Sequence, residues 1–163
     1  MSEIPSPADF TSAPLRHRLT VELNGRLADV WALVGDHERL SEYSAGISRV
    51  ELASDRNART CFFLAPDGTS EGIVLREVIR WEAPMVGYAT SALVPNDFGL
   101  TNDLALVTLA AVEGVTALTW EQYYDHPDLP MMRANFDEGL VDIGQRLTGK
   151  FGGRIVERYV DET

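Results

Sequence analysis

The sequence predicts an α+β fold in which a curved antiparallel sheet of six to seven strands wraps around one long C-terminal helix, with two short helices after the first strand. Two observations predict this arrangement. Residues 47–125 consist of alternating segments separated by short turns, and strands joined by short turns pair antiparallel. The segment after them carries apolar residues at steps of three and four, and only this segment is long enough to cover one face of the sheet.

The N-terminal part of the chain supplies the first strand and the two short helices. Residues 1–14 contain prolines among small and polar residues and are expected to be a flexible tail, followed by one domain over residues 15–163. Helical spacing in RLADVWALVGD predicts one short helix, and HERLSEYSAG predicts a second short helix or turn. Residues 15–23 alternate as a strand whose apolar face consists of Leu15, His17, Leu19, Val21 and Leu23.

Six further strands and the long helix complete the predicted fold. The helix is expected over residues 129–150, because Asp128 is a suitable N-cap and Pro130 is tolerated in the first turn. Residues 152–163 suit either a frayed helix or a strand. The helix has an apolar stripe formed by Met132, Phe136, Leu140, Ile143, Leu147 and Phe151. The strands are expected over residues 47–53, 59–65, 69–82, 86–94, 104–112 and 116–125.

Composition and charge narrow the range of partners. The chain of 163 residues has 25 acidic and 14 basic residues, a formal net charge of −11. An acidic protein repels nucleic acid and anionic membrane surfaces, so neither is expected as a partner. A neutral or cationic small molecule, or another protein, is the expected partner, and the chain is expected to be a monomer or a homodimer.

Cysteine content and hydropathy predict a cytoplasmic protein. Cys61 is the only cysteine, which excludes an intramolecular disulfide and a cysteine-based metal site. The first 14 residues lack the basic and apolar regions of a secretory signal. No apolar run approaches the roughly 18 residues that span a bilayer, so no stable membrane insertion is expected.

Several stretches in this order resemble the START-like (SRPBCC) helix-grip superfamily, in particular its bacterial polyketide cyclase/dehydrase and lipid-transport group. ADVWALVGDHERLSEY resembles the two-helix entry of that group, with Tyr43 where tryptophan is commoner. GISRVEL, EVIRWEAPMVGY and TALTW resemble its strands, and FDEGLVDI resembles its long helix. The likeness covers about residues 15–150.

The resemblance implies a cavity between the sheet and the long helix, open at one end and usually occupied by an apolar or aromatic ligand. It does not imply one activity, because the superfamily includes carriers, cyclases, hydrolases and receptors. Many members carry an acidic residue early in the central strand. Counting back from WEAP places Arg76 at that point, whereas strand alternation favours Glu77.

Glu77 is the candidate catalytic residue with the clearest sequence signal. In EGIVLREVIRW it shares a face with Ile73, Leu75, Ile79 and Trp81. If that face is internal, Glu77 is a desolvated carboxylate suited to acid–base chemistry or ligand anchoring. The alternative is a bulge that shifts the register and leaves Glu77 on the surface.

An internal Glu77 needs a hydrogen-bond partner, because an unpaired buried carboxylate is costly. The expected partners are His17, Tyr88 and Gln122. His17 is the second candidate catalytic residue, although a lone core histidine is more often a structural hydrogen-bonding group. His37 and His126 lie in turns and are expected at the surface. No two histidines have ligand spacing and no paired-carboxylate motif occurs, so neither a metal nor another cofactor is expected.

The candidate ligand-binding residues lie on the strand 116–125, on the strand 86–94 and on the long helix. Alternation turns Trp120, Gln122 and Tyr124 inward, where they are either ligand contacts or ordinary core residues. Tyr88 has the same two interpretations, and Met132 and Phe136 line the cavity mouth under the resemblance. The full set of candidates is Tyr88, Trp120, Gln122, Tyr124, Met132, Asn135, Phe136 and Leu140.

Gly139 is unexpected inside the long helix, because glycine there costs about 1 kcal/mol relative to alanine. Its missing side chain leaves either volume for a ligand or room for a strand to approach closely. The leading hypothesis is a carrier or binding protein for a hydrophobic or aromatic small molecule. The alternatives are a polyketide cyclase/aromatase-type enzyme using Glu77 or His17 with Tyr124, and a protein–protein adaptor.

Overall fold

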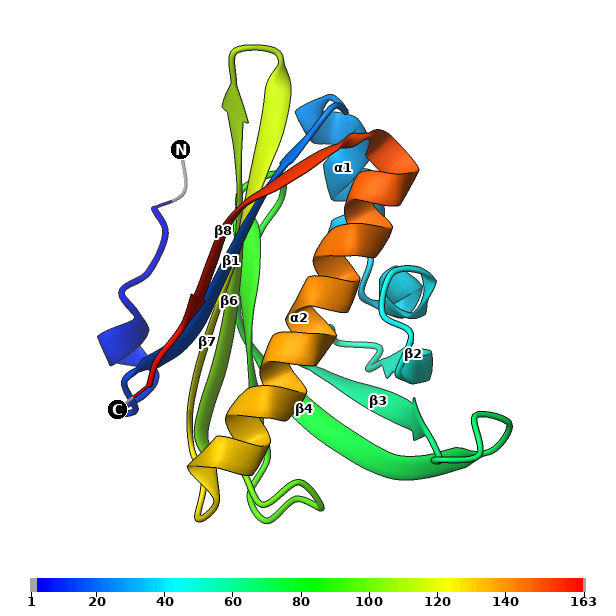
Figure 1. Ribbon diagram of the computed structural model, residues 1–163, viewed down its shortest axis with the longest axis vertical. Helices are drawn as coiled ribbons and strands as arrows, with labels where there is room; N and C mark the ends of the chain where they lie inside the picture. The colour runs from blue at the N-terminus through cyan, green and yellow to red at the C-terminus, as the bar shows by residue number, and fades with distance from the viewer. Residues whose placement is uncertain (1–2, 163) are drawn as a thin grey trace.

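The protein folds as one antiparallel sheet of eight strands with a long helix across its concave face (Figure 1). This computed structural model describes residues 3–162. The predicted α+β class is confirmed, and the short helices follow the first strand as expected. In chain order the elements are η1 (Pro7–Asp9), β1 (Leu15–Leu23), α1 (Leu27–Val34), η2 (His37–Glu42), β2 (Ile47–Leu52), β3 (Ala58–Leu64), β4 (Glu71–Ala83), β5 (Gly87–Ala92), β6 (Thr101–Val112), β7 (Val115–Asp125), α2 (Leu129–Phe151) and β8 (Gly153–Val160).

The strand order is β2-β3-β4-β5-β6-β7-β1-β8, and every neighbouring pair is antiparallel. Strands β2 to β7 follow the order of the chain, as short turns require. β1 lies between β7 and β8, so the first and last strands meet at one side of the sheet. None of the described helices is long and apolar enough to cross a membrane.

The sheet has one strand more than the sequence predicts, because the tail after α2 forms β8. Gly152 and Gly153 both have positive φ, 77° and 122°, which reverses the chain directly after the helix. A Cβ on Gly153 would lie 1.9 Å from the carbonyl oxygen of Glu22, so the β1 backbone passes too close for any side chain. β8 then runs antiparallel to β1 as far as the pair His17–Val160.

Two β-bulges move predicted core residues to the outer face of the sheet. The register of β4 shifts between Ile79 and Trp81, and Trp81 packs outside with Ala89. The register of β1 shifts between Leu15 and His17, and Leu15 joins the same outer cluster. The predictions that Trp81 shares a face with Glu77, and Leu15 with His17, are therefore wrong. A bulge changes the face of every residue beyond it, and simple alternation does not detect it.

Residues 3–14 run along the outer face of the sheet. Within them η1 forms a single 3-10 turn, and Phe10 and Ala13 pack in the outer apolar cluster with Trp81. Ala13 is buried there. The prediction that residues 1–14 are flexible, with residues 15–163 forming a single domain, stays a prediction, and residues 1, 2 and 163 lie outside the described part of the chain.

The helix α2 sits closely on the sheet near its C-terminal end and stands away from it nearer its start. Asp128 caps the helix as predicted, with its carboxylate accepting from the N–H of Met131 at 3.2 Å. Leu140 and Ile143 are buried against the sheet. A Cβ on Gly144 would meet side chains of β1 and β8 at 3.1 Å, whereas a Cβ on Gly139 would meet nothing within 4 Å. Open space therefore remains under Gly139.

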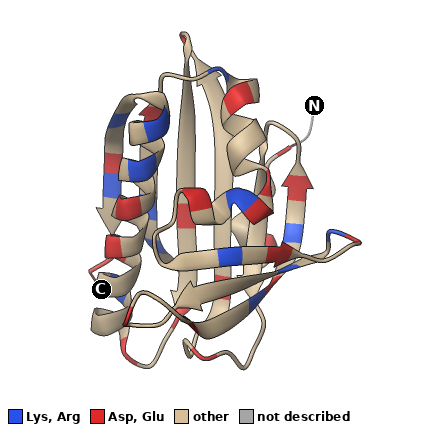
Figure 2. Ribbon diagram, turned by 90° about the vertical axis from the view of Figure 1, so that its right-hand side faces the viewer, with Lys and Arg blue, Asp and Glu red and all other residues tan. Residues whose placement is uncertain are grey.

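Charged residues cover the outside of α2. Figure 2 shows acidic and basic positions interleaved along the helix, with both signs again on η2 and β8. Several are paired: Arg146 with Asp142 one turn away at 3.1 Å, and Asp137 with Arg158 of β8. Such exposed pairs contribute little individually. They mark the solvent-facing side of the helix and leave the opposite side for the interior.

We expect Gly153→Ala to destabilise the fold, because the added methyl group would meet the β1 backbone and a positive φ would be imposed on alanine. The expected loss is about 1–3 kcal/mol in the free energy of unfolding, measured by urea titration. Gly149→Ala is the matched control. Gly149 is an exposed α2 residue with open space around it, so this change should stabilise the helix by up to about 1 kcal/mol. Equal stability of the two variants would contradict the tight β1–β8 turn.

Candidate functional site

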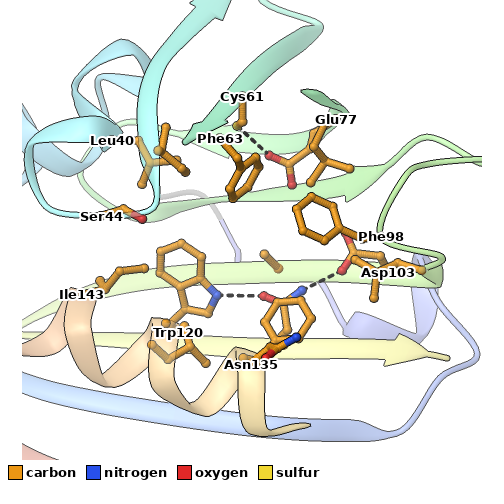
Figure 3. Close-up of a pocket in the computed structure, with 18 of the residues that line it drawn as sticks. Leu40, Ser44, Cys61, Phe63, Glu77, Phe98, Asp103, Trp120, Asn135 and Ile143 are labelled. Carbon is orange, nitrogen blue, oxygen red and sulfur yellow. Dashed lines mark hydrogen bonds between the residues drawn. The ribbon is translucent and has the colours of Figure 1, made fainter. Parts of the chain in front are cut away.

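A cavity of about 220 Å³ lies between α2 and the concave face of the sheet (Figure 3). Drug-sized ligands occupy pockets of roughly 300–1,000 Å³, so this cavity suits a smaller molecule. Most of its wall is aliphatic or aromatic. The aromatic residues are Phe63, Phe98, Trp120 and Phe136, and the polar ones are Ser44, Arg59, Glu77, Asp103, Gln122 and Asn135.

Strand alternation brings these side chains together. Residues two apart on a strand point to the same face, and four strands each present such residues to the cavity. β5 lies between β4 and β6 but has only small residues on this stretch of its inner face. The contributing residues are Arg59, Cys61 and Phe63 of β3, Leu75 and Glu77 of β4, Asp103 and Ala105 of β6, and Trp120 and Gln122 of β7.

Glu77 points into this cavity, as strand alternation predicted. It is 7% exposed, whereas Arg76 is exposed on the other face. The bulge in β4 lies beyond Glu77 and does not change its orientation. The expected hydrogen-bond partners are wrong. Its Oε1 accepts from Nε of Arg59 at 2.9 Å, because Arg59 and Glu77 are directly opposed in the β3–β4 ladder.

Further hydrogen bonds surround the Glu77 carboxylate. The thiol of Cys61 donates to Oε1 at 3.4 Å, and the hydroxyl of Thr90 donates to Oε2 at 3.4 Å. Burial, followed by the charge of Glu77, raises the pKa of Cys61 well above its usual value. Cys61 therefore stays a protonated thiol and is not a nucleophile here. Glu77 is a paired carboxylate in an apolar wall.

His37 holds the other side of Arg59. Nη1 of Arg59 donates to Nδ1 of His37 at 3.0 Å, and Nε2 of His37 donates to Glu82 at 2.6 Å. Because Nδ1 accepts, this hydrogen-bond network places the single ring proton on Nε2. Burial lowers the pKa of His37, and the charge of Arg59 lowers it further. The prediction that His37 lies at the surface is wrong. It is the first residue of η2 and is only 1% exposed, and its ring packs edge to face against that of Tyr88.

Asp103 is a second carboxylate in the cavity. Its Oδ1 accepts from Nε2 of Gln122 at 2.6 Å, and its Oδ2 accepts from the N–H of Ala92 at 2.9 Å. The indole N–H of Trp120 donates to Oε1 of Gln122 at 3.0 Å, which fixes the orientation of the Gln122 amide (Figure 3). Burial, followed by repulsion from Glu77, raises the pKa of Asp103 to about 7.

Asp103 is not among the predicted site residues, because the alternating pattern predicts a strand that begins at residue 104. β6 begins at Thr101, and Asp103 shares its inner face with Ala105 and Val107. Extending the alternation by one residue would have found it. Arg59 lies on the predicted strand 59–65, but a single strand gives no sign of the carboxylate opposite it. His37 carries no sequence signal of burial.

His17 lies beside the cavity and does not line it. Its Nε2 is 2.9 Å from the hydroxyl of Tyr124, and its ring is stacked with that of Tyr124 and tilted against that of Phe136. Burial lowers the pKa of His17 to about 4, so the ring is neutral at physiological pH. Tyr124 and Tyr88 are also fully buried outside the cavity lining. The candidates that do line the cavity are Glu77, Trp120, Gln122, Met132, Asn135, Phe136 and Leu140. Their roles in binding or catalysis stay predictions.

The cavity opens on one side of α2. Asn135 and Gly139 line it and are also exposed to solvent. Ser44, which follows η2, also lines the cavity and lies across from Ile143 of the helix in Figure 3. The solvent-exposed part of the cavity wall therefore lies at Asn135 and Gly139 of α2.

Comparison with known proteins places this geometry in a fold family. No family model matches the chain, and no curated protein matches it. Among solved structures, a START superfamily protein from Mycobacterium smegmatis is 16% identical, with a TM-score of 0.66 over 83% of this chain and 97% of that chain. Ara h 8.0201 is 13% identical, with a TM-score of 0.64 over 84% and 97%. The chain has the START-like helix-grip fold.

A conserved protein from Geobacillus kaustophilus shares the helix-grip fold at 15% identity, with a TM-score of 0.66 over 88% of this chain and all of that chain, 100%. Identities this low show the fold alone. The predicted helix-grip architecture is therefore confirmed, from the short helices after β1 to the long helix α2. Within this fold, the cavity of the present chain contains the Arg59–Glu77 pair and Asp103.

We expect Glu77→Gln to destabilise the protein by about 3–5 kcal/mol, because it leaves the guanidinium of Arg59 buried without its counter-charge. Chemical denaturation at pH 7.5 measures this change. Glu71→Gln is the matched control, since Glu71 pairs with Arg49 on the exposed part of β4, and it should change stability little. Similar losses in the two variants would show that burial of the Arg59–Glu77 pair carries no special energy.

We expect Asp103 to make the folded protein less stable as pH rises. The unfolded chain loses this proton near the usual value of 3.8, whereas the folded chain holds it to about 7. The proton therefore stabilises the fold at acid pH, and that contribution is lost between about pH 4 and pH 7, at up to about 1.4 kcal/mol per pH unit. Relative to wild type, Asp103→Asn should gain stability over this window in urea titrations. The exposed Asp97→Asn should follow the wild-type pH profile, and a parallel profile for Asp103→Asn would contradict the raised pKa.

Proposed function

We propose that this protein binds a small, largely apolar molecule in the cavity between α2 and the sheet, as a carrier or binding protein. The observation that carries the proposal is the cavity itself. It has about 220 Å³ of space, mostly apolar walls and a solvent opening at Asn135 and Gly139. Preformed apolar pockets with a few placed polar groups are typical of small-molecule sites.

The polar groups of the cavity are held in place by the protein rather than by solvent. Trp120, Gln122 and Asp103 form one hydrogen-bonded row, and Arg59 and Glu77 form another. Buried polar groups that served packing alone would be expensive to retain, because apolar residues of the same volume fill a core at lower cost. These rows support a role in orienting a ligand with a polar end.

The proposed compartment and oligomeric state are those expected from the sequence. Cys61 is a free, buried thiol, which fits a reducing compartment, and we place the protein in the cytoplasm as a monomer or homodimer. The resemblance to the helix-grip superfamily, in which the cavity usually holds an apolar or aromatic ligand, supports the same function. An open cavity also favours ligand binding over the adaptor hypothesis, for which a filled groove is expected.

An enzyme is the second candidate, and one observation favours it. Asp103 has a pKa of about 7 and shares its cavity with Glu77, so one carboxylate can exchange a proton near neutral pH beside another that is held by Arg59. A polyketide cyclase/aromatase-type reaction would use this pair rather than His17 and Tyr124, which lie outside the cavity lining. Turnover of a poly-β-carbonyl thioester that Asp103→Asn abolishes would support this candidate.

Native mass spectrometry of the purified protein tests the binding function directly. A co-purified molecule of a few hundred daltons, released on denaturation, is the expected result. Titration with 2-naphthalenemethanol, a neutral aromatic probe, gives a second measure by its fluorescence. The proposal would be contradicted if the protein retains no molecule and the probe shows no saturable binding.

We expect Gly139→Leu to weaken binding of 2-naphthalenemethanol at least about tenfold, because the new side chain enters open space at the cavity mouth. Stability should hold or rise by up to about 1 kcal/mol, since leucine favours the helix more than glycine. Gly149→Leu is the matched control: it sits in open space on the same helix but away from the cavity. It should gain similar stability and bind the probe normally. A Gly139→Leu protein that melts several degrees lower with unchanged affinity would contradict this account.

A further inference from the structure

The charges that line the cavity do not balance. The guanidinium of Arg59 is matched by Glu77, 2.9 Å away, and His37 behind it is neutral because its Nδ1 accepts from Arg59. Asp103 has no such match. Its oxygens accept from two uncharged donors, the amide of Gln122 and the N–H of Ala92. An ionised Asp103 therefore leaves one negative charge uncompensated among the described residues that line the cavity.

Burying an uncompensated charge is unfavourable, and Asp103 shows the consequence. The residue is 6% exposed, and burial together with repulsion from Glu77 raises the pKa of its carboxyl to about 7. A positive charge in the cavity would offset both unfavourable effects at once. A negative charge would add to them, and a neutral ligand would leave them as they are.

Aromatic rings occupy the rest of the same space. Phe63 and Phe98 meet edge to face with their ring centroids 5.0 Å apart, and Trp120 and Phe136 line the cavity from β7 and α2. Trp120 already donates its only N–H to Gln122, so it offers a ligand its ring rather than a hydrogen bond. The faces of aromatic rings attract cations, and such attraction is strongest where water is excluded.

We propose that the ligand is a small organic cation, an amine carried on an apolar or aromatic body, with its ammonium group against Asp103 and its body among the aromatic rings. This inference rests on the proposed ligand-binding function and adds the charge of the ligand to it. The formal net charge of −11 acts in the same direction, because it attracts cations to the protein and repels anions. Figure 3 shows Asp103, Glu77 and Phe98 directed into one space.

Binding of a cation must depend on pH. Asp103 on β6 is faced by Glu77 of β4 and Arg59 of β3, by the uncharged donors Gln122 of β7 and Ala92 of β5, and by no ionisable α2 residue among those that line the cavity. Glu77 and Arg59 neutralise one another, so Asp103 is the group that changes charge. Since a cation favours the ionised carboxylate, its binding below about pH 7 releases a proton from Asp103.

Three probes of one shape test the charge of the ligand. Isothermal titration calorimetry of the wild-type protein with 2-naphthylmethylamine, 2-naphthalenemethanol and 2-naphthoate compares a cation, a neutral molecule and an anion. At pH 8 we expect the amine to bind roughly tenfold to hundredfold more tightly than the alcohol, the range of a charge-assisted hydrogen bond, and naphthoate to bind most weakly. Below pH 7 the amine's advantage should fall by about tenfold per pH unit.

Proton release gives a measurement that a merely apolar pocket would not produce. Titrations at pH 6 in two buffers of different ionisation enthalpy should show about one proton released for each amine bound, and none for the alcohol. Asp103→Asn should bring the ratio of amine to alcohol affinity close to one. Asp97→Asn removes the same charge from an exposed position outside the cavity and should preserve the ratio. If Asp103→Asn does not fold, the pH dependence of amine binding to the wild-type protein and the number of protons released still test whether the ligand is a cation.

The outcomes separate this inference from the function on which it rests. Equal affinities for amine and alcohol, or tightest binding of naphthoate, would overturn the cation and leave the binding function intact. Binding of the amine without proton release at pH 6 would overturn the role of Asp103. Failure of all three probes to bind, together with no molecule retained in native mass spectrometry, would overturn the binding function and the cation inference together.

Discussion

The long helix α2 is far narrower than the sheet on which it lies, and the cavity follows from this mismatch in width. Eight strands at about 4.8 Å spacing span roughly 34 Å, whereas an α-helix with its side chains is about 10–12 Å across. The sheet buries its inner face by curving around α2, with α1 and η2 packed on the same core, and these helices do not fill the curve completely. α2 packs mainly against β1 and β8, where Gly144 permits close approach. Opposite β3 and β4 the helix stands away, and the cavity occupies that space.

The two polar rows of the cavity wall differ in how their charge is handled. Arg59 joins Glu77 to His37, and His37 continues to Glu82, so one row runs from the cavity to a carboxylate that also pairs with the exposed Arg56. Every charge in it has a partner. In the other row Asp103 meets only amide groups. The charges are therefore paired in one row of the cavity wall, whereas an ionised Asp103 has no counter-charge in the other.

Strand periodicity was a reliable guide wherever the ladder was regular. It correctly predicted that Glu77, Trp120 and Gln122 face inward and that Arg76 faces outward. The same alternation, extended to the true start of β6, also places Asp103 on the inner face. It failed at Trp81 and Leu15, because a bulge inserts one residue and reverses the faces beyond it. Strand periodicity could not predict the hydrogen-bond partner of Glu77, for a different reason. Pairing depends on which residue lies opposite, and a single strand does not contain that information.

Three features could be predicted without any structure, because they depend on local periodicity and local hydrogen bonds. They are the fold class, the long helix with its Asp128 cap and the inward carboxylate at Glu77. The sequence also shows a glycine at position 139 of the helix. The open space around its Cβ position depends instead on where α2 lies in the fold. Tertiary structure alone decided the eighth strand, the burial of His37 and the separation of His17 and Tyr124 from the cavity. Each of these depends on which distant segments meet, and that is settled by the packing of the whole curved sheet around one helix.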